Sequence, residues 1–338
     1  MISFIFDAFS DSWGMGNTRD ERLDFFKGFL MLSVVFGHTI NALFYKTGLH
    51  IELHTILRTF DMPMFMLVSG YLLKGSLQRH GTWATIANRA SNVAFPAIIF
   101  IIITYILSCT NTYYFLWAIF GSSVIVAIAV KYINVKWLQL IFLVLAVAIF
   151  HFTDYRCMNM AYLMPFFVAG YYVEELKISK IQGIVATVAF CIALFFWDTR
   201  YTFWNYGANL LHNTPRTLAV CGFRFAIGIL GSATAVFVLS YLYKRLQNNR
   251  LTVMVTQFGK ETLAIYLMQY IIVEVGLKEL AALYYKWLGA NPATQHPTIT
   301  GYIVAPVLAF ALTATIYWLA VLLKKYKATR WLFGFKIH

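Results

Sequence analysis

The chain has 338 residues, of which 60% are hydrophobic and only 12% are charged. Soluble domains carry about a quarter charged residues, so this composition excludes a soluble globular protein and predicts a polytopic membrane protein. The formal net charge is +13, but the lysines and arginines stand in short clusters between apolar runs. Such clusters orient a membrane protein and suit anionic lipid or an anionic cofactor. We expect no nucleic-acid partner, because the basic residues form no continuous patch.

About ten apolar stretches have roughly the ~20 residues that a helix needs to cross a bilayer core. They cover residues 24–44, 57–75, 93–110, 112–130, 137–152, 158–174, 182–198, 217–242, 258–279 and 299–323. We therefore expect an all-α membrane protein with about ten transmembrane helices. Most lysines and arginines fall on the side that holds both ends of the chain, which predicts that both ends face the cytoplasm.

This arrangement divides the chain into three parts. Residues 1–23 are expected to form a cytoplasmic or interfacial segment, residues 24–323 the transmembrane domain, and residues 324–338 a basic cytoplasmic tail. The longest outward segments, 198–216 and 280–298, mix aromatic, amide and small residues. That composition suits stacking on sugars and equally suits an aromatic belt at the membrane interface.

The first expected span, "LDFFKGFLMLSVVFGHTINALF", carries Asp24, Lys27 and His38. Successive residues of a helix turn by 100°, so Lys27 and His38 share one face about 16 Å apart along the axis. Asp24 and Asn41 lie on the same face, which gives the span a polar stripe that should face protein. For His38, near mid-membrane, two interpretations are open: a histidine held by a neighbouring helix, or a functional group.

Three further charged residues lie in expected spans: Asp61 before Pro63, Arg224 in "CGFRFAIGILG" and Glu274 in "YIIVEVG". A charge at the bilayer centre costs about 2.5 kcal/mol or more, so we expect Arg224 to pair with Asp61 or Glu274. Structural pairing and use in a site are both open for each residue.

Two segments look alike, "MPMFMLVSGY" and "MPFFVAGY", but their spacings from proline to glycine differ. We interpret both as helix packing through small residues, not as an internal repeat.

Other catalytic and metal-binding signatures are missing from the sequence. It contains no His-Glu-x-x-His, no phosphate-binding glycine loop and no Gly-x-Ser-x-Gly. The eight histidines are dispersed. The four cysteines have no metal-ligand spacing: Cys109, Cys157, Cys191 and Cys221. We expect neither a metal site nor a disulfide framework.

Several stretches, taken in order, resemble the acyltransferase 3 family of integral membrane acyltransferases. "RLDFFKGFLMLSVVFGH" is similar to the family's Arg-x-x-Asp/Arg-Gly opening and the apolar helix that ends in histidine. "FDMPMFMLVSGYLL" is close to its Met-Pro-Leu-Phe-Phe…Ser-Gly-Tyr, and "FGKETLAIYLMQY" to its Gly-Lys-x-Ser/Thr-Leu-x-Ile-Tyr. "NRASNVAFP" looks like the basic segment before a proline at the third span. The order and spacing match over nearly the whole chain.

Within that family the chain looks like the fucose 4-O-acetylase-like branch, which modifies sugars of bacterial surface glycans. Two positions depart from the pattern, because Asp61 and Gln269 stand where many relatives have histidine. The resemblance implies that His38 is the catalytic histidine and that Arg22 is the family's arginine before the first span. We add Asp61 to the catalytic candidates.

The resemblance also implies substrates and a location. The donor is an acyl-CoA, with acetyl-CoA favoured, that enters from the cytoplasm. The acceptor is a hydroxyl of a cell-surface or lipid-linked carbohydrate, and the location is the bacterial inner membrane. His38 would act as general base or as acyl acceptor, two routes that the sequence leaves open.

Charge suggests which residues hold these substrates. CoA phosphates suit basic residues at the cytoplasmic side, and the candidates there are Arg22, Lys27, Lys74, Arg79 and Arg89. For the last three, orientation of the membrane protein is an equally good explanation. The candidates on the acceptor side are Asn41, Ser69, Arg224, Gln269 and Glu274.

A glycolipid transporter or flippase is the alternative, because it could use the same buried charges as a substrate path. Transporters commonly show repeated halves with broken helices at matching positions. We find no such repeat in the sequence.

Overall fold

The computed structural model describes residues 20–44, 51–107, 113–151, 158–173, 180–198 and 215–334. Within these ranges the chain is helical apart from short turns, and no strand occurs, as expected for an all-α protein. Five helical stretches are long and apolar enough to cross a membrane: Glu21–Leu43, Glu52–Ile106, Tyr114–Tyr132, Ala219–Leu246 and Pro297–Lys325. Lys136–Ile149 and Lys180–Phe195 are apolar but shorter. Cys109, Cys157 and residues 199–214 of one outward segment lie outside the described residues.

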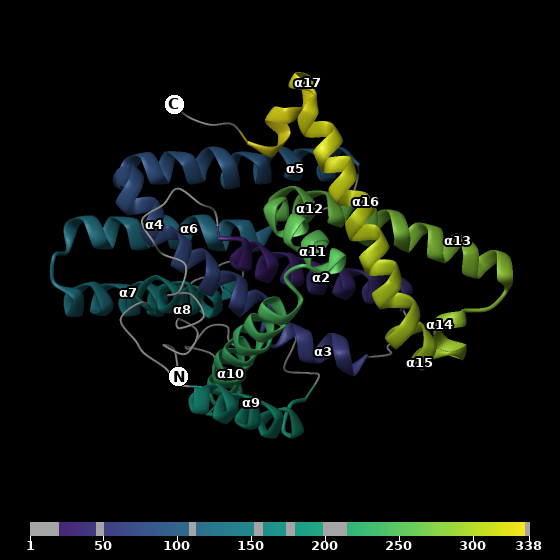
Figure 1. Cartoon of the computed structure of the whole chain (residues 1–338), viewed down its shortest axis with the longest axis horizontal. Helices are drawn as coiled ribbons and strands as arrows, with labels where there is room; N and C mark the ends of the chain where they lie inside the picture. Colours follow the sequence, from purple (N-terminus) through teal and green to yellow (C-terminus); the bar gives the residue numbers. More distant parts are fainter. Residues whose placement is uncertain are drawn as a thin grey trace.

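Helix α2, Glu21–Leu43, is the central element of the fold (Figure 1). Its start is capped by Asp20, whose Oδ1 accepts hydrogen bonds from the backbone N–H groups of Arg22 (2.9 Å) and Leu23 (3.3 Å). Helices on several sides pack against α2: α4 (Asp61–Arg89), α11 (Arg250–Lys260) and α16 (Ala305–Lys325). Most of its side chains are therefore buried.

Helix α4 is longer than the expected second span. It follows the short helix α3, Glu52–Arg58, and continues to Arg89 with a break at Gly81, whose φ of 72° is in the left-handed region. Beyond the break the chain turns back on itself. The Thr85 hydroxyl then lies close enough to donate a hydrogen bond to the Ser76 carbonyl (3.1 Å). A π-helical segment, Ala90–Ala94, then leads into α5, Phe95–Ile106. The sequence pattern missed this hairpin because its residues are too polar to look like a span.

The next five expected spans each coincide with a helix. They are α6 (Tyr114–Tyr132), α7 (Lys136–His151), α8 (Met158–Tyr172), α9 (Lys180–Phe195) and α10 (Pro215–Leu246).

The two look-alike segments pack against each other, one on α4 and one on α8. A Cβ on Gly70 would lie 1.9 Å from the carbonyl oxygen of Phe167, and a Cβ on Gly170 would lie 2.0 Å from that of Leu67. Only glycine allows backbones to approach this closely, so the interpretation as small-residue packing is confirmed.

The expected ninth span, 258–279, is not one regular helix. It is divided into α11, α12 (Thr262–Gln269) and a π-helical segment, Tyr270–Leu277, with an interruption at Glu261. The chain then continues as α13, Lys278–Leu288, and as the short helix α14, Pro292–Gln295. Most of the expected outward loop 280–298 is therefore helical. Apolar run length could not show this, because α13 is amphipathic and only one of its residues, Ala281, is buried.

The last expected span, 299–323, corresponds to a short helix, a π-helical segment and α16. The short helix is α15 (Pro297–Ile299) and the π-helical segment is Thr300–Val304. Beyond α16, the described chain ends with α17 (Lys327–Arg330) and a 3-10 turn, Trp331–Phe333. These C-terminal residues pack on the start of α5 through ring contacts of Trp331 with Phe95 and of Phe333 with Phe100.

Candidate functional site

The side chains of His38 of α2 and Glu274 of the π-helical segment Tyr270–Leu277 are hydrogen-bonded to each other. The distance from His38 Nδ1 to Glu274 Oε2 is 2.5 Å. A π-helix changes the direction in which its side chains point relative to an α-helix, and such segments are frequent at functional sites. Here it aims a carboxylate at a histidine 236 residues away in sequence. The sequence had placed Glu274 among the acceptor-side candidates and did not connect it with His38.

The pair is accessible and is not sealed in the core. The side chains of His38 and Glu274 keep 28% and 27% of their surface exposed. His38 lies in the C-terminal third of α2, closer to Leu43 than to Glu21. It lies towards the end of the helix that is remote from Arg22.

Asp61 lies at the start of α4 and is 4% exposed. Its Oδ1 accepts a hydrogen bond from the backbone N–H of Met62 at 2.6 Å. Arg58 and His38 are the charged groups close enough to act electrostatically on its carboxylate. Asp61 is thus close enough to His38 for the two to interact electrostatically, and Arg58, at the end of α3, is the cation with the strongest effect on its carboxylate.

Arg224 of α10 lies over an aromatic ring. Its guanidinium carbon is 4.6 Å from the ring centroid of Tyr162, which comes from α8. Tyr162 also lies within electrostatic range of Asp61, and Tyr114, at the start of α6, lies within range of Arg58, Asp61 and Arg224. The structure thus pairs Glu274 with His38 rather than with Arg224, and the cation that acts most strongly on Asp61 is Arg58.

Tyr114, Tyr162 and Arg58 were not singled out from the sequence. Tyrosines near the ends of apolar helices look like ordinary interfacial residues, and an arginine outside a span looks like a topology signal. Only the fold brings all three within electrostatic range of Asp61.

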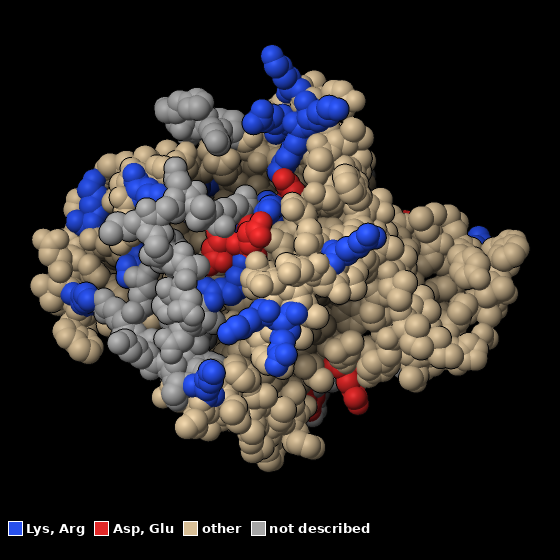
Figure 2. Space-filling model, in the orientation of Figure 1, with Lys and Arg blue, Asp and Glu red and all other residues tan. Residues whose placement is uncertain are grey.

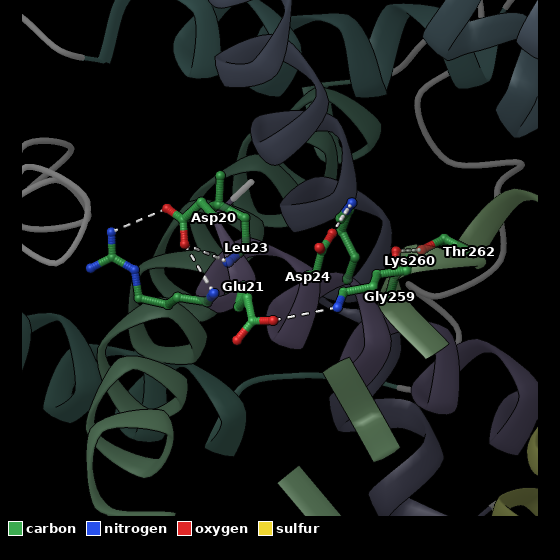
Figure 3. Close-up of polar contacts among 9 residues, drawn as sticks. Asp20, Glu21, Leu23, Asp24, Gly259, Lys260 and Thr262 are labelled. Atoms are coloured by element: carbon green, nitrogen blue, oxygen red, sulfur yellow. Dashed lines mark hydrogen bonds and ion pairs between the residues drawn. The ribbon is translucent and has the colours of Figure 1, made fainter. Parts of the chain in front are cut away.

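A second polar group lies at the opposite end of α2, where α2 meets α11 (Figure 3). Lys27 Nζ is 2.6 Å from Asp24 Oδ1, and Lys260 Nζ is 3.4 Å from Glu21 Oε1. Nearby, Lys324 of α16 forms an ion pair with Glu261. Because Asp24 is only 2% exposed, the Asp24–Lys27 pair neutralises a buried charge, and Lys27 offers less positive potential to a donor phosphate than the sequence suggested.

The helix backbones touch at this end. A Cβ on Gly28 would lie 1.8 Å from the carbonyl oxygen of Val255, and a Cβ on Gly259 would lie 1.7 Å from that of Asp24. The glycines of the sequence motifs "DFFKG" and "FGKET" therefore form the crossing of α2 and α11, which holds the start of α2 in place.

The other donor candidates surround the hairpin at Gly81. Lys74 and Arg89 are half-buried and Arg79 is exposed. Arg79 Nε donates to the Gly75 carbonyl at 3.1 Å, and Arg89 directly precedes the π-helical segment Ala90–Ala94. Arg22 is half-buried at the start of α2, and its Nη2 lies 3.6 Å from Asp20 Oδ2.

The remaining acceptor candidates lie in different surroundings. Ser69 is half-buried beside the Gly70 crossing, whereas Asn41 is exposed on α2 and departs from the expected protein-facing stripe. Gln269 ends α12, is 2% exposed, and its Oε1 has no hydrogen-bond partner among the described residues. Within the same part of the chain, no group of three or more His, Cys, Asp or Glu is placed to hold a metal ion.

Comparisons with known proteins identify the family. The family model described as an acyltransferase domain matches residues 20–324. The chain is 24% identical to Nodulation protein NolL of Sinorhizobium fredii over 287 residues, which are 75% of this chain and 78% of that protein. It is 23% identical to Nodulation protein NolL of Mesorhizobium japonicum over 286 residues, 75% of this chain and 76% of that protein. No solved structure matches. Since the family model covers most of the chain, the protein belongs to the acyltransferase 3 family and is a membrane acyltransferase.

Proposed function

We propose that this protein is an O-acetyltransferase that moves an acetyl group from acetyl-CoA to a hydroxyl of a cell-surface or lipid-linked carbohydrate, at His38. Acyl transfer itself follows from the family. The observation that supports the choice of residue is the 2.5 Å contact between His38 Nδ1 and Glu274 Oε2 on an accessible part of the bundle. The bacterial inner membrane and the cytoplasmic origin of the donor are part of the same proposal.

The contact with Glu274 prepares the ring of His38 for chemistry. An ionised carboxylate only accepts hydrogen bonds, so Nδ1 carries the proton and Nε2 keeps its lone pair. Nε2 then removes the proton of the acceptor hydroxyl while the hydroxyl oxygen attacks the thioester carbonyl. The C–S bond breaks, and the departing CoA thiolate takes the proton from the imidazolium. Glu274 stabilises the imidazolium between these two proton transfers.

A covalent route uses the same geometry. Nε2 would attack the thioester itself, CoA would leave, and the acyl-imidazole would then be cleaved by the acceptor hydroxyl. Both the general-base route and the covalent route need Nδ1 to be held by Glu274. The contact between His38 and Glu274 therefore supports the proposal for either route.

The basic residues at the other end of α2 fit the donor. Arg22 lies at the level of the Asp24–Lys27 pair, and Lys27 and His38 are about 16 Å apart along the helix. An extended pantetheine arm spans a comparable distance, so CoA phosphates near Arg22 would place the thioester near His38. Arg79 and Arg89 in the Gly81 hairpin, and Lys74 before it, are the further candidates for those phosphates.

The test uses purified protein with acetyl-CoA and a glycan acceptor. His38→Ala should bind acetyl-CoA as the unchanged protein does, and should lose at least ~10²-fold in acetyl transfer, the usual contribution of a positioned base. Arg22→Ala should do the reverse and weaken acetyl-CoA binding by roughly 10- to 100-fold, the value of a charge-assisted hydrogen bond. His296→Ala, an exposed histidine far along the chain, is the control and should leave both unchanged. Full acetyl transfer by His38→Ala would reject the proposal.

A further inference from the structure

One buried phenol joins the start of α6 to the helix that leads to Glu274. Tyr113 stands directly before α6 and is 1% exposed. Its hydroxyl donates a hydrogen bond to the backbone carbonyl of Leu267 in α12, at 3.1 Å and across 154 residues of sequence. This carbonyl lies three residues before the π-helical segment Tyr270–Leu277, which carries Glu274. The bond takes no part in the transfer chemistry, so its place next to this segment needs another explanation.

The ring of Tyr113 contacts both sides of the junction where α12 ends and the π-helical segment begins. Its centroid is 6.2 Å from that of Tyr266, in α12, and 6.1 Å from that of Tyr270, the first residue of the π-helical segment. A third ring, Phe100 of α5, lies 6.4 Å away. All three contacts are T-shaped, a geometry that aromatic pairs favour. Tyr113 is therefore fixed against the junction by its ring as well as by its hydroxyl.

The backbone of Tyr113 has an unfavourable conformation. Its φ of 45° and ψ of 41° are in the left-handed region, which a bulky residue rarely adopts. Among the described residues, no other residue except glycine has a positive φ. Such strain persists only where the surrounding structure over-determines it. The contacts of Tyr113 with the junction supply that constraint, so its position there is strongly specified.

A hydroxyl bound to this carbonyl favours the change from α-helix to π-helix. In an α-helix the Leu267 carbonyl would accept the N–H of Ile271, four residues further on. Ile271 belongs to the π-helical segment, and in a π-helix the hydrogen bonds join residues five apart. A side chain that inserts into the regular ladder of a helix distorts the helix locally. The Tyr113 hydroxyl therefore stabilises the π-helical register at the point where it begins.

The register in turn decides where Glu274 points. Glu274 is the fifth residue of the π-helical segment, and its Oε2 is 2.5 Å from His38 Nδ1. If the segment were α-helical, the carboxylate would point in a different direction relative to α12. We propose that Tyr113 is a positioning residue, which holds the π-helical register and thereby keeps the Glu274 carboxylate on His38. This inference rests on the proposed function, since that function gives the contact its role in acyl transfer.

The substitution Tyr113→Phe tests the inference in the full chain in lipid nanodiscs. It keeps the ring and removes the hydroxyl, and the Leu267 carbonyl can then accept the Ile271 N–H, so the variant should fold. We expect kcat for acetyl transfer to fall roughly 3- to 10-fold, the value of one hydrogen bond, with unchanged KM for acetyl-CoA. The matched control is Tyr172→Phe, which removes a phenol O–H that donates to Gln139 Oε1 at 2.6 Å between α8 and α7. It should leave kcat unchanged.

Nitrogen NMR of the imidazole reports directly whether the carboxylate stays on His38. With isotope-labelled histidine, the signal of His38 is identified by its loss in His38→Ala. The unchanged protein should carry the proton on Nδ1, and Tyr113→Phe should show a larger share of the ring with the proton on Nε2. A hydroxyl that only stabilises the fold would not affect this signal. An unchanged His38 signal in Tyr113→Phe would overturn the inference.

A double-mutant cycle with Glu274→Gln asks whether Tyr113 acts through Glu274. Once the carboxylate is removed, Tyr113→Phe should lower kcat no further. The same fold-loss in both backgrounds would contradict the positioning role.

Two unnatural side chains at position 113 extend the comparison. If Tyr113→Phe does not fold, para-methylphenylalanine fills the volume of the hydroxyl without a donor, and it should give the same losses in kcat and in the Nδ1-protonated signal. Unchanged values of both in this protein would overturn the inference. Para-aminophenylalanine keeps a hydrogen-bond donor and should restore both.

The NMR measurement needs no turnover, so the two proposals fail in different ways. A His38 signal that depends on Tyr113, in a protein without acetyl transfer, would contradict the proposed function and leave the positioning role standing. Acetyl transfer that is lost in His38→Ala but unaffected in Tyr113→Phe would contradict the positioning role and leave the function standing.

Discussion

Glu274 determines what His38 can do, because the two side chains share one short contact (2.5 Å). A carboxylate at Nδ1 leaves Nε2 as the basic atom. An amide in its place can turn its NH₂ group towards Nδ1, which would favour the other tautomer and put the proton on Nε2. The charge of Glu274, and not only its shape, is therefore expected to matter.

We expect Glu274→Gln to lower acetyl transfer by roughly 10- to 1,000-fold with unchanged acetyl-CoA affinity, because the variant loses both the tautomer control and the charge that stabilises the imidazolium. Steady-state release of CoA, together with binding of acetyl-CoA, measures the two quantities. Glu279→Gln removes a nearby exposed carboxylate and should have no effect. A fully active Glu274→Gln enzyme would show that the contact is structural only.

At this scale the sequence singled out His38 as a candidate but did not indicate that Glu274 contacts it. The periodicity of α2 and the resemblance to the family both point to His38 as a group with a purpose. The contact with Glu274 depends on a π-helical segment, which rotates the carboxylate away from the direction that α-helical periodicity predicts. The expectation that Arg224 pairs with Asp61 or Glu274 came from the cost of an unpaired charge in the membrane, which does not indicate which partners meet.

Among the helices, two glycine crossings fix how the site is assembled. Gly28 and Gly259 join α2 to α11, and Gly70 and Gly170 join α4 to α8. At each crossing the atoms that a new Cβ would meet belong to backbone, so no side-chain rotation could relieve the clash. The neighbouring helices would have to separate.

Replacement of Gly259 by alanine should therefore be destabilising in spite of alanine's better helix propensity. We expect Gly259→Ala to lower the free energy of unfolding by about 1–3 kcal/mol, the usual cost of overpacking, and to reduce activity because α2 carries His38. Gly222 of α10 has nothing within 4 Å of an added Cβ, so Gly222→Ala should instead stabilise by about 0.5–1 kcal/mol. Thermal unfolding in detergent compares the two. If both substitutions changed the free energy of unfolding by the same amount in the same direction, the close backbone contact at Gly259 would be contradicted.

Most helices could be predicted from apolar run length, and the exceptions share a physical cause. The hairpin at Gly81 and helix α13 are both helical without being uniformly apolar. A search for spans detects segments that favour lipid on all sides. It cannot detect a polar or amphipathic helix, and it cannot show that a long apolar segment is interrupted, as at Glu261.

In the whole molecule, charged residues are unevenly distributed. On the face shown in Figure 2, Lys and Arg side chains gather around the end of α16 and α17 and around a central acidic group, whereas the surface over α13 carries few charges. Two contacts join segments that are expected in the cytoplasm. Lys131 Nζ, at the end of α6, lies 4.5 Å from the centroid of the Trp83 ring in the hairpin, and Lys260 Nζ of α11 lies 3.4 Å from Glu21 Oε1 of α2. Segments expected in the cytoplasm are thus near one another.

The ten-span topology stays a prediction, and reporter fusions can measure it. Fusions after Gly81 and after Asn249 should report the cytoplasm, because both sites lie in basic connecting segments. A fusion after residue 205 should report the opposite side. Reversed signals at two of the three positions would require a different number of spans.

The distance in sequence between His38 and Glu274, 236 residues, also has a consequence for biosynthesis. At about 5–20 residues per second, roughly 10–50 s pass between synthesis of the two residues. During that interval the helix that carries His38 is already made, while the segment that holds its partner carboxylate does not yet exist. In the mechanism proposed above, an unfinished chain therefore lacks the carboxylate that orients His38, and acyl transfer cannot begin before the segment around Glu274 has been inserted.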